Sequence, residues 1–292
     1  KNNCVPNVIF VSAKNRNRKR NIKINKKKWL KNYLDATKSK NVDIIVELIG
    51  GAEGAAKKLV FNALKNKKHV VTANKALIAK YGDQLSKIAE ENNVNLEFEA
   101  AVCGGVPIIR SLEEGLIANK INRVYGIFNG TSNYILSTMD KENKNFSDVL
   151  TDAKNLGYAE SNPLSDLNGD DVASKLKILS SLCFNSFIDH NIHVEGINFI
   201  DKLDIDNANK LGYKIKLLGV SEIINNKIYQ RVHPTLIKKS SYIASIDGVL
   251  NAVIVDGKPV GQNVIQGEGA GPEATTSALV SDISSILRGN IK

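Results

Sequence analysis

The first 100 residues alternate between short apolar runs and longer stretches with a helical repeat. Apolar residues gather at 43–49 and 69–72, and they recur at helical spacing between 75 and 92. The elements that this pattern predicts are a buried strand at Val8–Ser12, a strand at 43–49, a helix at 55–66, a strand at 69–72, a helix at 75–92 and a strand at 96–99. Strands that alternate with helices predict an α/β fold with a doubly wound parallel sheet.

From residue 121 the strands no longer alternate regularly with helices. The predicted elements are a strand at 123–130, a helix capped by Thr131-Ser132 that runs through Met139, a helix at 170–184, strands at 228–233 and 249–255, a turn at Asp256-Gly257, and a last helix with Pro272 in its first turn. This arrangement predicts a second, α+β domain. We therefore expect domains at 1–120 and 121–266, followed by a C-terminal helical segment at 267–292.

The net charge of +10 comes from one end of the chain. Residues 1–40 contain 13 Lys and Arg but a single acid, whereas the remaining residues are close to neutral. Most of these cations lie at 14–28, which we call the basic arm. A solvated loop is favoured over binding to nucleic acid or to an anionic surface, because no nucleic-acid-binding motif accompanies the charge.

Neither a membrane span nor a disulfide framework is expected. No apolar run approaches the roughly 18 residues that a membrane helix needs, and the first residues lack the layout of a secretory signal. The three cysteines, Cys4, Cys103 and Cys183, have no metal-binding or redox spacing. These features favour a cytoplasmic protein.

The segment 153–175 (AKNLGYAESNPLSDLNGDDVASK) combines acids, glycines and one lysine. Glu160 and Asp166 are expected on turns, because Gly157, Pro163 and Gly169 break the backbone. Lys175 falls within the apolar stripe of the helix that follows, and Asp171 stands one turn before it. Such a lysine is a candidate proton donor, whose pKa burial would lower and the aspartate would raise. The alternative is a surface lysine on a helix with an acidic first turn.

The same segment resembles the hallmark segment of homoserine dehydrogenases. Its fixed positions are Ala153, Gly157-Tyr158, an Asn-Pro pair, Asp-Leu-Asn-Gly, Asp171 and Lys175. The blocks VDIIVELIGG, HVVTANKALIA, EFEAAVCGGVPII and YGIFNGTSNYIL resemble the family in the same order. The resemblance therefore extends from about residue 43 to the end of the chain.

The resemblance implies a Rossmann-type NAD(P)-binding domain, a catalytic domain with a dimer-forming sheet, and a C-terminal helix that returns to the first domain. It implies the reduction of L-aspartate 4-semialdehyde to L-homoserine with NADPH or NADH, in threonine, methionine and isoleucine biosynthesis. The expected partners are this small-molecule substrate and further copies of the chain, in a homodimer or homotetramer. No nucleic-acid or membrane partner is expected.

The family's functional residues match positions throughout this chain. The resemblance implies catalytic roles for Lys175, as general acid, and Asp171. It implies substrate contacts for Glu160, Asp166, Asp171, Lys75, Thr131 and Tyr158, and cofactor contacts for Gly50, Gly51, Thr72, Lys75, Gly157, Gly269 and Gly271. It also implies a monovalent cation (sodium) at Glu99, Val102, Gly104 and Val106. Lys14, Arg16 and Arg18 are candidates for the 2′-phosphate of NADP, because they follow the strand expected at 8–12.

A dinucleotide fold usually opens with a strand and the glycine turn G-x-G-x-x-G, which binds the pyrophosphate. The residues before Val8 are too few to form this unit, so we expect roughly 30 residues of it to be absent. This leaves a non-catalytic, dehydrogenase-like subunit or inactive fragment as the alternative to an active enzyme.

Overall fold

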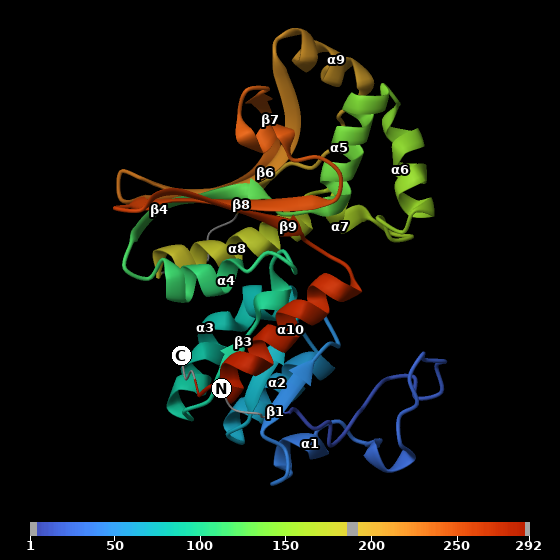
Figure 1. Ribbon diagram of the computed structural model, residues 1–292, viewed down its shortest axis with the longest axis vertical. Coiled ribbons are helices and arrows are strands. Elements are labelled where there is room, and N and C mark those ends of the chain that lie inside the picture. Colours follow the sequence, from blue (N-terminus) through green and yellow to red (C-terminus); the bar gives the residue numbers. More distant parts are fainter. Residues whose placement is uncertain (1–4, 186–191, 290–292) are drawn as a thin grey trace. The chain divides into compact units, whose positions relative to one another are not determined.

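The computed structural model describes residues 5–185 and 192–289 (Figure 1). The chain forms two compact units. Unit 1 consists of Lys1–Phe98 and Leu279–Lys292, and unit 2 consists of Glu99–Ala278. Unit 2 is therefore a continuous segment inserted into the chain of unit 1, and each unit has its own sheet.

Unit 1 contains a parallel sheet with the strand order β1-β2-β3. Its strands are β1 (Ile44–Glu47), β2 (His69–Thr72) and β3 (Leu96–Glu97), and its connecting helices are α2 (Ala55–Lys65) and α3 (Lys75–Glu91). Val70 and Val71 of β2 are fully buried, as are Val60 and Leu64 of α2 and Leu85 of α3. Parallel strands joined by helices confirm the expected α/β fold.

The buried strand predicted at Val8–Ser12 is wrong. In the described chain this segment makes only an isolated bridge between Val11 and Trp29, and Val8 is 58% exposed. An apolar run becomes a buried strand only where a neighbouring strand pairs with it along its length. The basic arm that follows is a loop with a short helix, η1 (Lys26–Lys28), and the guanidinium groups of Arg16 and Arg20 stack on Trp29. A short helix, α1 (Asp35–Lys38), follows it.

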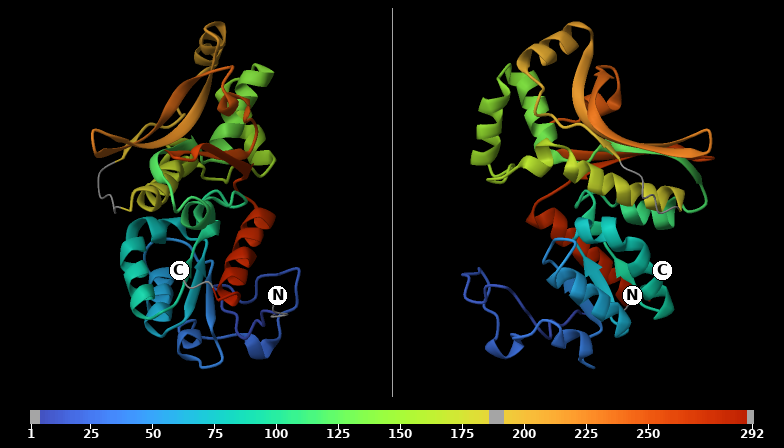
Figure 2. Two further views of the ribbon diagram at one scale, coloured as in Figure 1. Left: turned by 60° about the vertical axis from the view of Figure 1, so that its left-hand side comes forward. Right: turned by 180° about the vertical axis from the view of Figure 1, so that it is seen from behind.

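Unit 2 is built on a six-stranded sheet in the order β5-β7-β6-β4-β8-β9, antiparallel except between β5 and β7 (Figure 2). Its strands are β4 (Lys120–Ile127), β5 (His193–Val194), β6 (Tyr213–Ile224), β7 (Lys227–Lys238), β8 (Leu250–Lys258) and β9 (Gly261–Glu268). Helix α8 (Asp170–Phe184) packs on one face, where Ser180 and Ser221 are hydrogen-bonded. The short helix η4 (Tyr242–Ser245) contributes Ile243 and Ala244 to a cluster with Leu218 and Ile254 of the strands.

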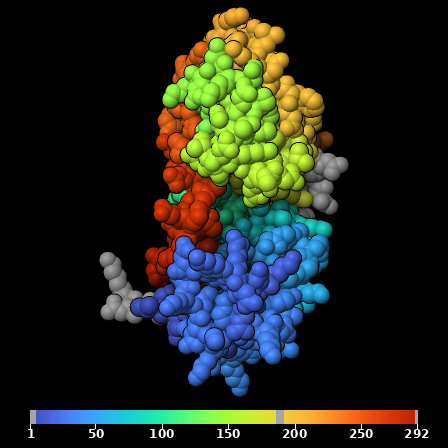
Figure 3. Space-filling model, turned by 90° about the vertical axis from the view of Figure 1, so that its right-hand side faces the viewer, coloured from blue at the N-terminus to red at the C-terminus, as the bar shows by residue number. Residues whose placement is uncertain are grey.

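The remaining helices of unit 2 are mostly short. They are η2 (Glu99–Ala101), α4 (Ile108–Arg110) continued by the π-turn η3 (Ser111–Gly115), α5 (Gly130–Glu142), α6 (Phe146–Asn155), α7 (Leu164–Leu167), α9 (Lys202–Lys210) and α10 (Pro272–Leu287), which continues into unit 1. Figure 3 shows α5 and α6, in green to yellow-green, on the surface of unit 2. Among the described helices, none is both long and apolar enough to span a membrane.

Several details of unit 2 differ from the prediction. Asn129, rather than Thr131-Ser132, caps α5, because its side-chain oxygen accepts a hydrogen bond from the Ser132 N–H. The turn after β8 comes later than Asp256-Gly257, since Gly257 still pairs with Gly261 of β9. Asp166 lies in the short helix α7 instead of a turn.

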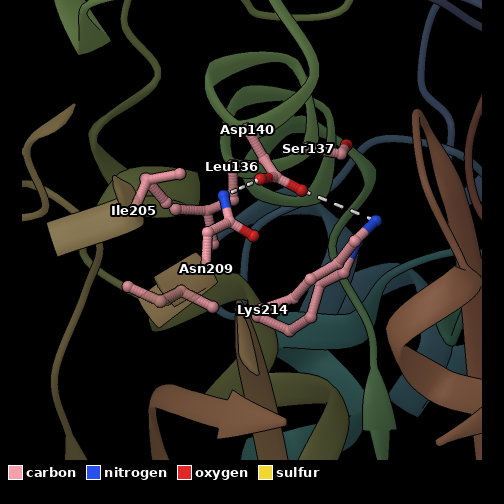
Figure 4. Close-up of a pocket in the computed structure, with 8 residues that line it drawn as sticks. Leu136, Ser137, Asp140, Ile205, Asn209 and Lys214 are labelled. Atoms are coloured by element: carbon pink, nitrogen blue, oxygen red, sulfur yellow. Dashed lines mark hydrogen bonds and ion pairs between the residues drawn. The ribbon is translucent and has the colours of Figure 1, made fainter. Parts of the chain in front are cut away.

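The interior of unit 2 contains a network of charged side chains between α5, α9 and β6 (Figure 4). Lys214 forms an ion pair with Asp140, which also accepts a hydrogen bond from Asn209. Lys216 is 1% exposed and donates to Asn133, the Ile246 carbonyl and Asp247 at 2.7 to 3.0 Å. Burial lowers the pKa of Lys216, and the ion pair with Asp247 opposes that effect. Three acceptors use all three hydrogens of the Lys216 ammonium group, which indicates a structural role.

Replacing Gly82 with alanine is expected to stabilise unit 1. Gly82 lies inside α3, and an added Cβ would meet only Ile78, at an ordinary contact distance of 3.5 Å. Alanine should therefore add about 0.5–1 kcal/mol to the free energy of unfolding, measured by urea denaturation. Gly212→Ala is the matched control, because its site is equally open but has a left-handed φ of +82°. A stabilising Gly212→Ala, or a destabilising Gly82→Ala, would contradict the described backbone.

Candidate active site

The first turns of α8 place a lysine and an aspartate inside unit 2. Lys175 and Asp171 are 8% and 5% exposed, as the helical repeat predicted for Lys175. The Lys175 ammonium group donates to Asp171 Oδ2 at 2.8 Å and to the Phe128 carbonyl, just after β4, at 2.6 Å. These contacts use two of its three hydrogens among the described residues, so one hydrogen can be donated to a ligand.

The pKa of Lys175 is set by two opposing influences. Burial lowers it, while the negative charge of Asp171 raises it, and the net result is a pKa above the ordinary lysine value. The negative charge of Asp166, at the same site, also raises it. The lysine therefore holds its proton until an acceptor of comparable basicity, such as an alkoxide, forms beside it.

Asn129, which no sequence pattern singled out, joins the acids of the site. Its Nδ2 donates to Asp166 Oδ1 at 2.8 Å and to Asp171 Oδ2 at 2.9 Å, while its Oδ1 caps α5. A signal that could have found it is the position of an Asn just before the helix that starts at Gly130, where Asn is a common N-cap. That signal predicts the bond to the Ser132 N–H but not the bonds to acids 37 and 42 residues away.

The structure places the other predicted substrate residues, Thr131, Tyr158 and Glu160, in different surroundings. Thr131 donates to the Tyr158 carbonyl at 2.7 Å, and the Tyr158 ring packs against Tyr134. Gly157, just before Tyr158, has a left-handed φ of +76°. Glu160 is exposed, and the structure describes no hydrogen bond or ion pair from it to another described residue. The structure thus brings together Lys175, Asp171, Asp166, Thr131 and Tyr158 through α5, α7 and α8.

Asp166→Asn is expected to stabilise the protein at neutral pH. Burial raises the pKa of Asp166 above its ordinary value, and the charge of Asp171 adds to this effect although the Asn129 donor opposes it. Because the pKa of Asp166 is higher in the folded than in the unfolded protein, folding favours the protonated carboxyl. The stability that this gives is fully present below the unfolded-state pKa, about 3.9. It is lost as the pH rises through the folded-state pKa.

Asparagine should therefore raise the melting temperature at pH 7, and the difference from wild type should shrink toward pH 4. Thermal unfolding across this range provides the measurement. A variant that is destabilised equally at every pH would contradict the assignment.

Two glycine-containing segments, around Gly105 and Gly269, cross each other beside this site. The Gly105 N–H donates to the Glu268 carbonyl at 2.9 Å, and a Cβ on Gly105 would come within 2.6 Å of that oxygen. Gly104 lies against the Gly269 carbonyl, and Gly269 lies against the Asn251 side chain. Glycines are needed here because the two backbones approach without room for side chains. Gly271, two residues on, has a left-handed φ of +108°.

The predicted cation residues occupy the loop that begins this crossing. The Glu99 carboxylate accepts hydrogen bonds from the Ile109 and Arg110 N–H groups, each at 2.9 Å, and burial raises its pKa. Val102, Gly104 and Val106 would contribute backbone carbonyls, of which that of Val106 accepts the Ile108 N–H. Among the described residues no group of three His, Cys, Asp or Glu side chains could hold a metal. The cation stays a prediction.

In unit 1 the carboxyl ends of β1 and β2 are tied together by Glu47. This side chain is fully buried, accepts the N–H groups of Ile49 and Gly50 at 2.6 and 3.0 Å, and accepts the Thr72 hydroxyl at 2.6 Å. Asn74 donates to the Gly51 carbonyl and caps α3, in which Lys75 is the first residue. Glu47 was missed because a lone acid in an apolar run gives no sign of its partners.

These strand ends suit a nucleotide cofactor. Ligands of open α/β sheets bind beyond the carboxyl ends of the strands. Gly50 and Gly51 have left-handed φ values of +83° and +79°, and no atom lies within 4 Å of an added Cβ. This turn therefore exposes backbone to a ligand that approaches closely. Arg16 and Arg18 lie on the basic arm, and no described hydrogen bond joins them to the turn.

Comparison with known proteins identifies the family. The family model for homoserine dehydrogenase matches residues 107–284, and the model for the homoserine dehydrogenase NAD-binding domain matches residues 3–99. The chain belongs to the homoserine dehydrogenase family. Homoserine dehydrogenase from Neisseria gonorrhoeae is 48% identical over 261 residues, which cover 89% of this chain and 60% of the relative. The enzyme from Bacillus subtilis is 40% identical over 286 residues, covering 98% of this chain and 66% of the relative.

Solved homoserine dehydrogenases have the same fold. The structure from Thiobacillus denitrificans has a TM-score of 0.86 at 48% identity and covers 89% of this chain and 60% of the solved chain. A hyperthermophilic archaeal homoserine dehydrogenase mutant in complex with NADPH has a TM-score of 0.76 at 28% identity, covering 88% of this chain and 75% of the other. The chain spans about three fifths of the length of the first curated homoserine dehydrogenases that it matches.

Proposed function

We propose that this homoserine dehydrogenase family member catalyses the reversible, NAD(P)H-dependent reduction of L-aspartate 4-semialdehyde to L-homoserine. The buried ion pair of Lys175 and Asp171, with one ammonium hydrogen available to a ligand, is the observation that supports it. The family assignment supports the same reaction class. The pathway would be threonine, methionine and isoleucine biosynthesis, in the cytoplasm.

In this mechanism Lys175 is the general acid. NADPH or NADH, when bound, supplies the hydride that adds to the aldehyde carbon. As the carbonyl π bond breaks, Lys175 Nζ gives a proton to the oxygen, and the resulting amine regains a proton from solvent. Asp171 and the Phe128 carbonyl hold the ammonium group in place during this transfer. In the reverse direction the neutral Lys175 amine takes the hydroxyl proton.

The acids of the site would bind the other end of the substrate. Asp166 and Asp171 would accept hydrogen bonds from the substrate's amino group, because a cation in a partly buried site requires paired anions. Glu160 would join them from the segment after Gly157. Thr131 of α5 and Tyr158, after α6, would also line the site. Lys75 would be a further substrate-binding residue.

The cofactor and assembly follow as further parts of the proposal. The residues that would hold the cofactor are Gly50, Gly51, Thr72, Lys75, Gly157, Gly269 and Gly271. Arg16 and Arg18 would lie near the 2′-phosphate of NADP. A sodium ion would bind Glu99 and the carbonyls of Val102, Gly104 and Val106, since oxygen ligands suit a hard cation. The sheet of unit 2 would form a homodimer or homotetramer.

The test is NADPH oxidation dependent on L-aspartate 4-semialdehyde, assayed in parallel on the 292-residue chain and on any longer reading frame that contains it. Turnover in either polypeptide that disappears in Lys175→Met supports the proposal. Absence of turnover from both, in protein shown to be folded by circular dichroism, would overturn it. The result would then favour a non-catalytic, dehydrogenase-like subunit.

A further inference from the structure

The orientation of the Asn129 side chain is determined by its surroundings. Its Oδ1 faces the backbone N–H of Ser132 at 2.8 Å, and its Nδ2 faces two carboxylate oxygens, on Asp166 and Asp171. The flipped amide would place an oxygen against two carboxylates and an NH₂ group against an N–H. Asn129 is 5% exposed, so water cannot easily substitute for either contact.

The helix cap alone does not require an asparagine. Serine, threonine and aspartate all cap helices through a side-chain oxygen. Only the amide offers, in addition, two N–H donors in one plane, and both are used here for acids on different elements, α7 and α8. A substitution can therefore remove the hydrogen bonds from Asn129 to the two acids and keep its helix cap.

The two hydrogen bonds from Asn129 Nδ2, which we call the bridge, set the distance between Asp166 and Asp171. Because one planar NH₂ group reaches both oxygens, these oxygens lie about 5 Å apart. Asp171 Oδ2 accepts from both Asn129 and Lys175, but a carboxylate has about four acceptor positions. The two acids therefore have further lone pairs with which to accept another nitrogen donor. A primary ammonium group has the donors and the charge to occupy that position.

We propose that Asn129 is a positioning residue that holds Asp166 and Asp171 at the spacing that binds the substrate's ammonium group. This inference rests on the proposed function and deepens it. Asn129 itself need not touch the substrate. Its amide offsets part of the repulsion between the two acids, and the groups that face Asp166 are Asp171, Lys175, Thr131 and Asn129.

Two variants separate the bridge from the cap. Asn129→Ser keeps the cap oxygen but loses both N–H donors, and Asn129→Asp keeps the cap and the volume but adds a third carboxylate. Asn145→Ser is the matched control, because Asn145 is the exposed N-cap of α6 and faces Asp148. All three are made in the polypeptide that is assayed for turnover.

Kinetics provide the first readout. Asn129→Ser should raise the KM for aspartate semialdehyde by roughly 10-fold or more and leave the KM for NADPH within about 2-fold, because bonds to charged groups are among the strongest. Asn129→Asp should also move the acid limb of the kcat/KM profile to higher pH, by about one unit. Asn145→Ser should match wild type. Equal changes in both KM values, together with a lower melting temperature, would show that Asn129 only supports the fold.

A titration independent of turnover provides the second readout. The pKa of the Asp166 carboxyl, followed by ¹³C NMR in the free protein and assigned with Asp166→Asn, should rise in Asn129→Ser because a donor to its ionised form is lost. An unchanged Asp166 pKa would overturn the positioning role. If the wild-type protein lacks dehydrogenase activity but this pKa shifts, the proposed substrate is wrong while the bridge between the acids stands.

Discussion

Replacing Lys175 with methionine should reduce kcat by a factor of roughly 10² or more, with the protein still folded. Methionine has a similar length and removes the cost of burying a charge, although Asp171 then loses its ammonium partner and keeps the hydrogen bond from Asn129. Without the ammonium group the site loses the group proposed to protonate the carbonyl oxygen. The measurement is single-turnover NADPH oxidation, which separates the chemical step from product release.

The control is Lys154→Met, which removes an exposed lysine from α6 in the same unit and should leave kcat unchanged. A second comparison is Lys175→Arg, which keeps the charge but holds its proton too tightly to transfer it readily. Near-wild-type turnover in Lys175→Met would remove this residue from the mechanism. Equal losses in Lys154→Met would show that the effect is one of folding or of charge in general.

Gly126→Ala should destabilise unit 2 by about 3 kcal/mol or more. Gly126 lies within β4, where it is paired with Val253 of β8. A Cβ there would stand 2.0 Å from the Ala252 carbonyl oxygen and 2.9 Å from the Phe128 ring. The backbone of β8 cannot move away without breaking its pairing with β4. The free energy of unfolding from urea denaturation provides the measurement.

Gly115→Ala offers the comparison, because no atom lies within 4 Å of an added Cβ there and the backbone conformation is ordinary. It should change stability by less than about 0.5 kcal/mol. A Gly126→Ala variant as stable as wild type would mean that β4 and β8 do not pair in the described register. Because the Phe128 carbonyl holds Lys175, any Gly126→Ala protein that still folds should also show lower turnover.

Patterns of neighbouring residues gave correct predictions where the result depends on one helix or on one connection between strands. The apolar stripe of 170–184 placed Lys175 inside unit 2, since a helix fixes which side chains share a face. The alternation of strands and helices at 43–97 identified the parallel sheet, because such strands require helical connections. Both inferences depend on neighbours within one turn or one connection.

The features that were missed depend on residues far apart in the chain. Val8–Ser12 has the composition of a buried strand, yet its burial depends on a partner that composition cannot reveal. Asn129 and Glu47 bond to groups 25 to 42 residues away, and nothing nearby in sequence signals these contacts. The structure likewise leaves Glu160 exposed, so its predicted contact with the substrate awaits experiment.

The hydrogen bond between Gly105 and Glu268 joins residues that lie near the two ends of the inserted segment, Glu99–Ala278. All six strands of the larger sheet lie between these residues. A segment whose ends lie close together can be inserted into another chain without moving apart the residues on either side of the insertion point. Unit 2, Glu99–Ala278, can therefore be exchanged as one piece, and recombination just outside these glycine-rich segments should join it to the cofactor unit of another family member.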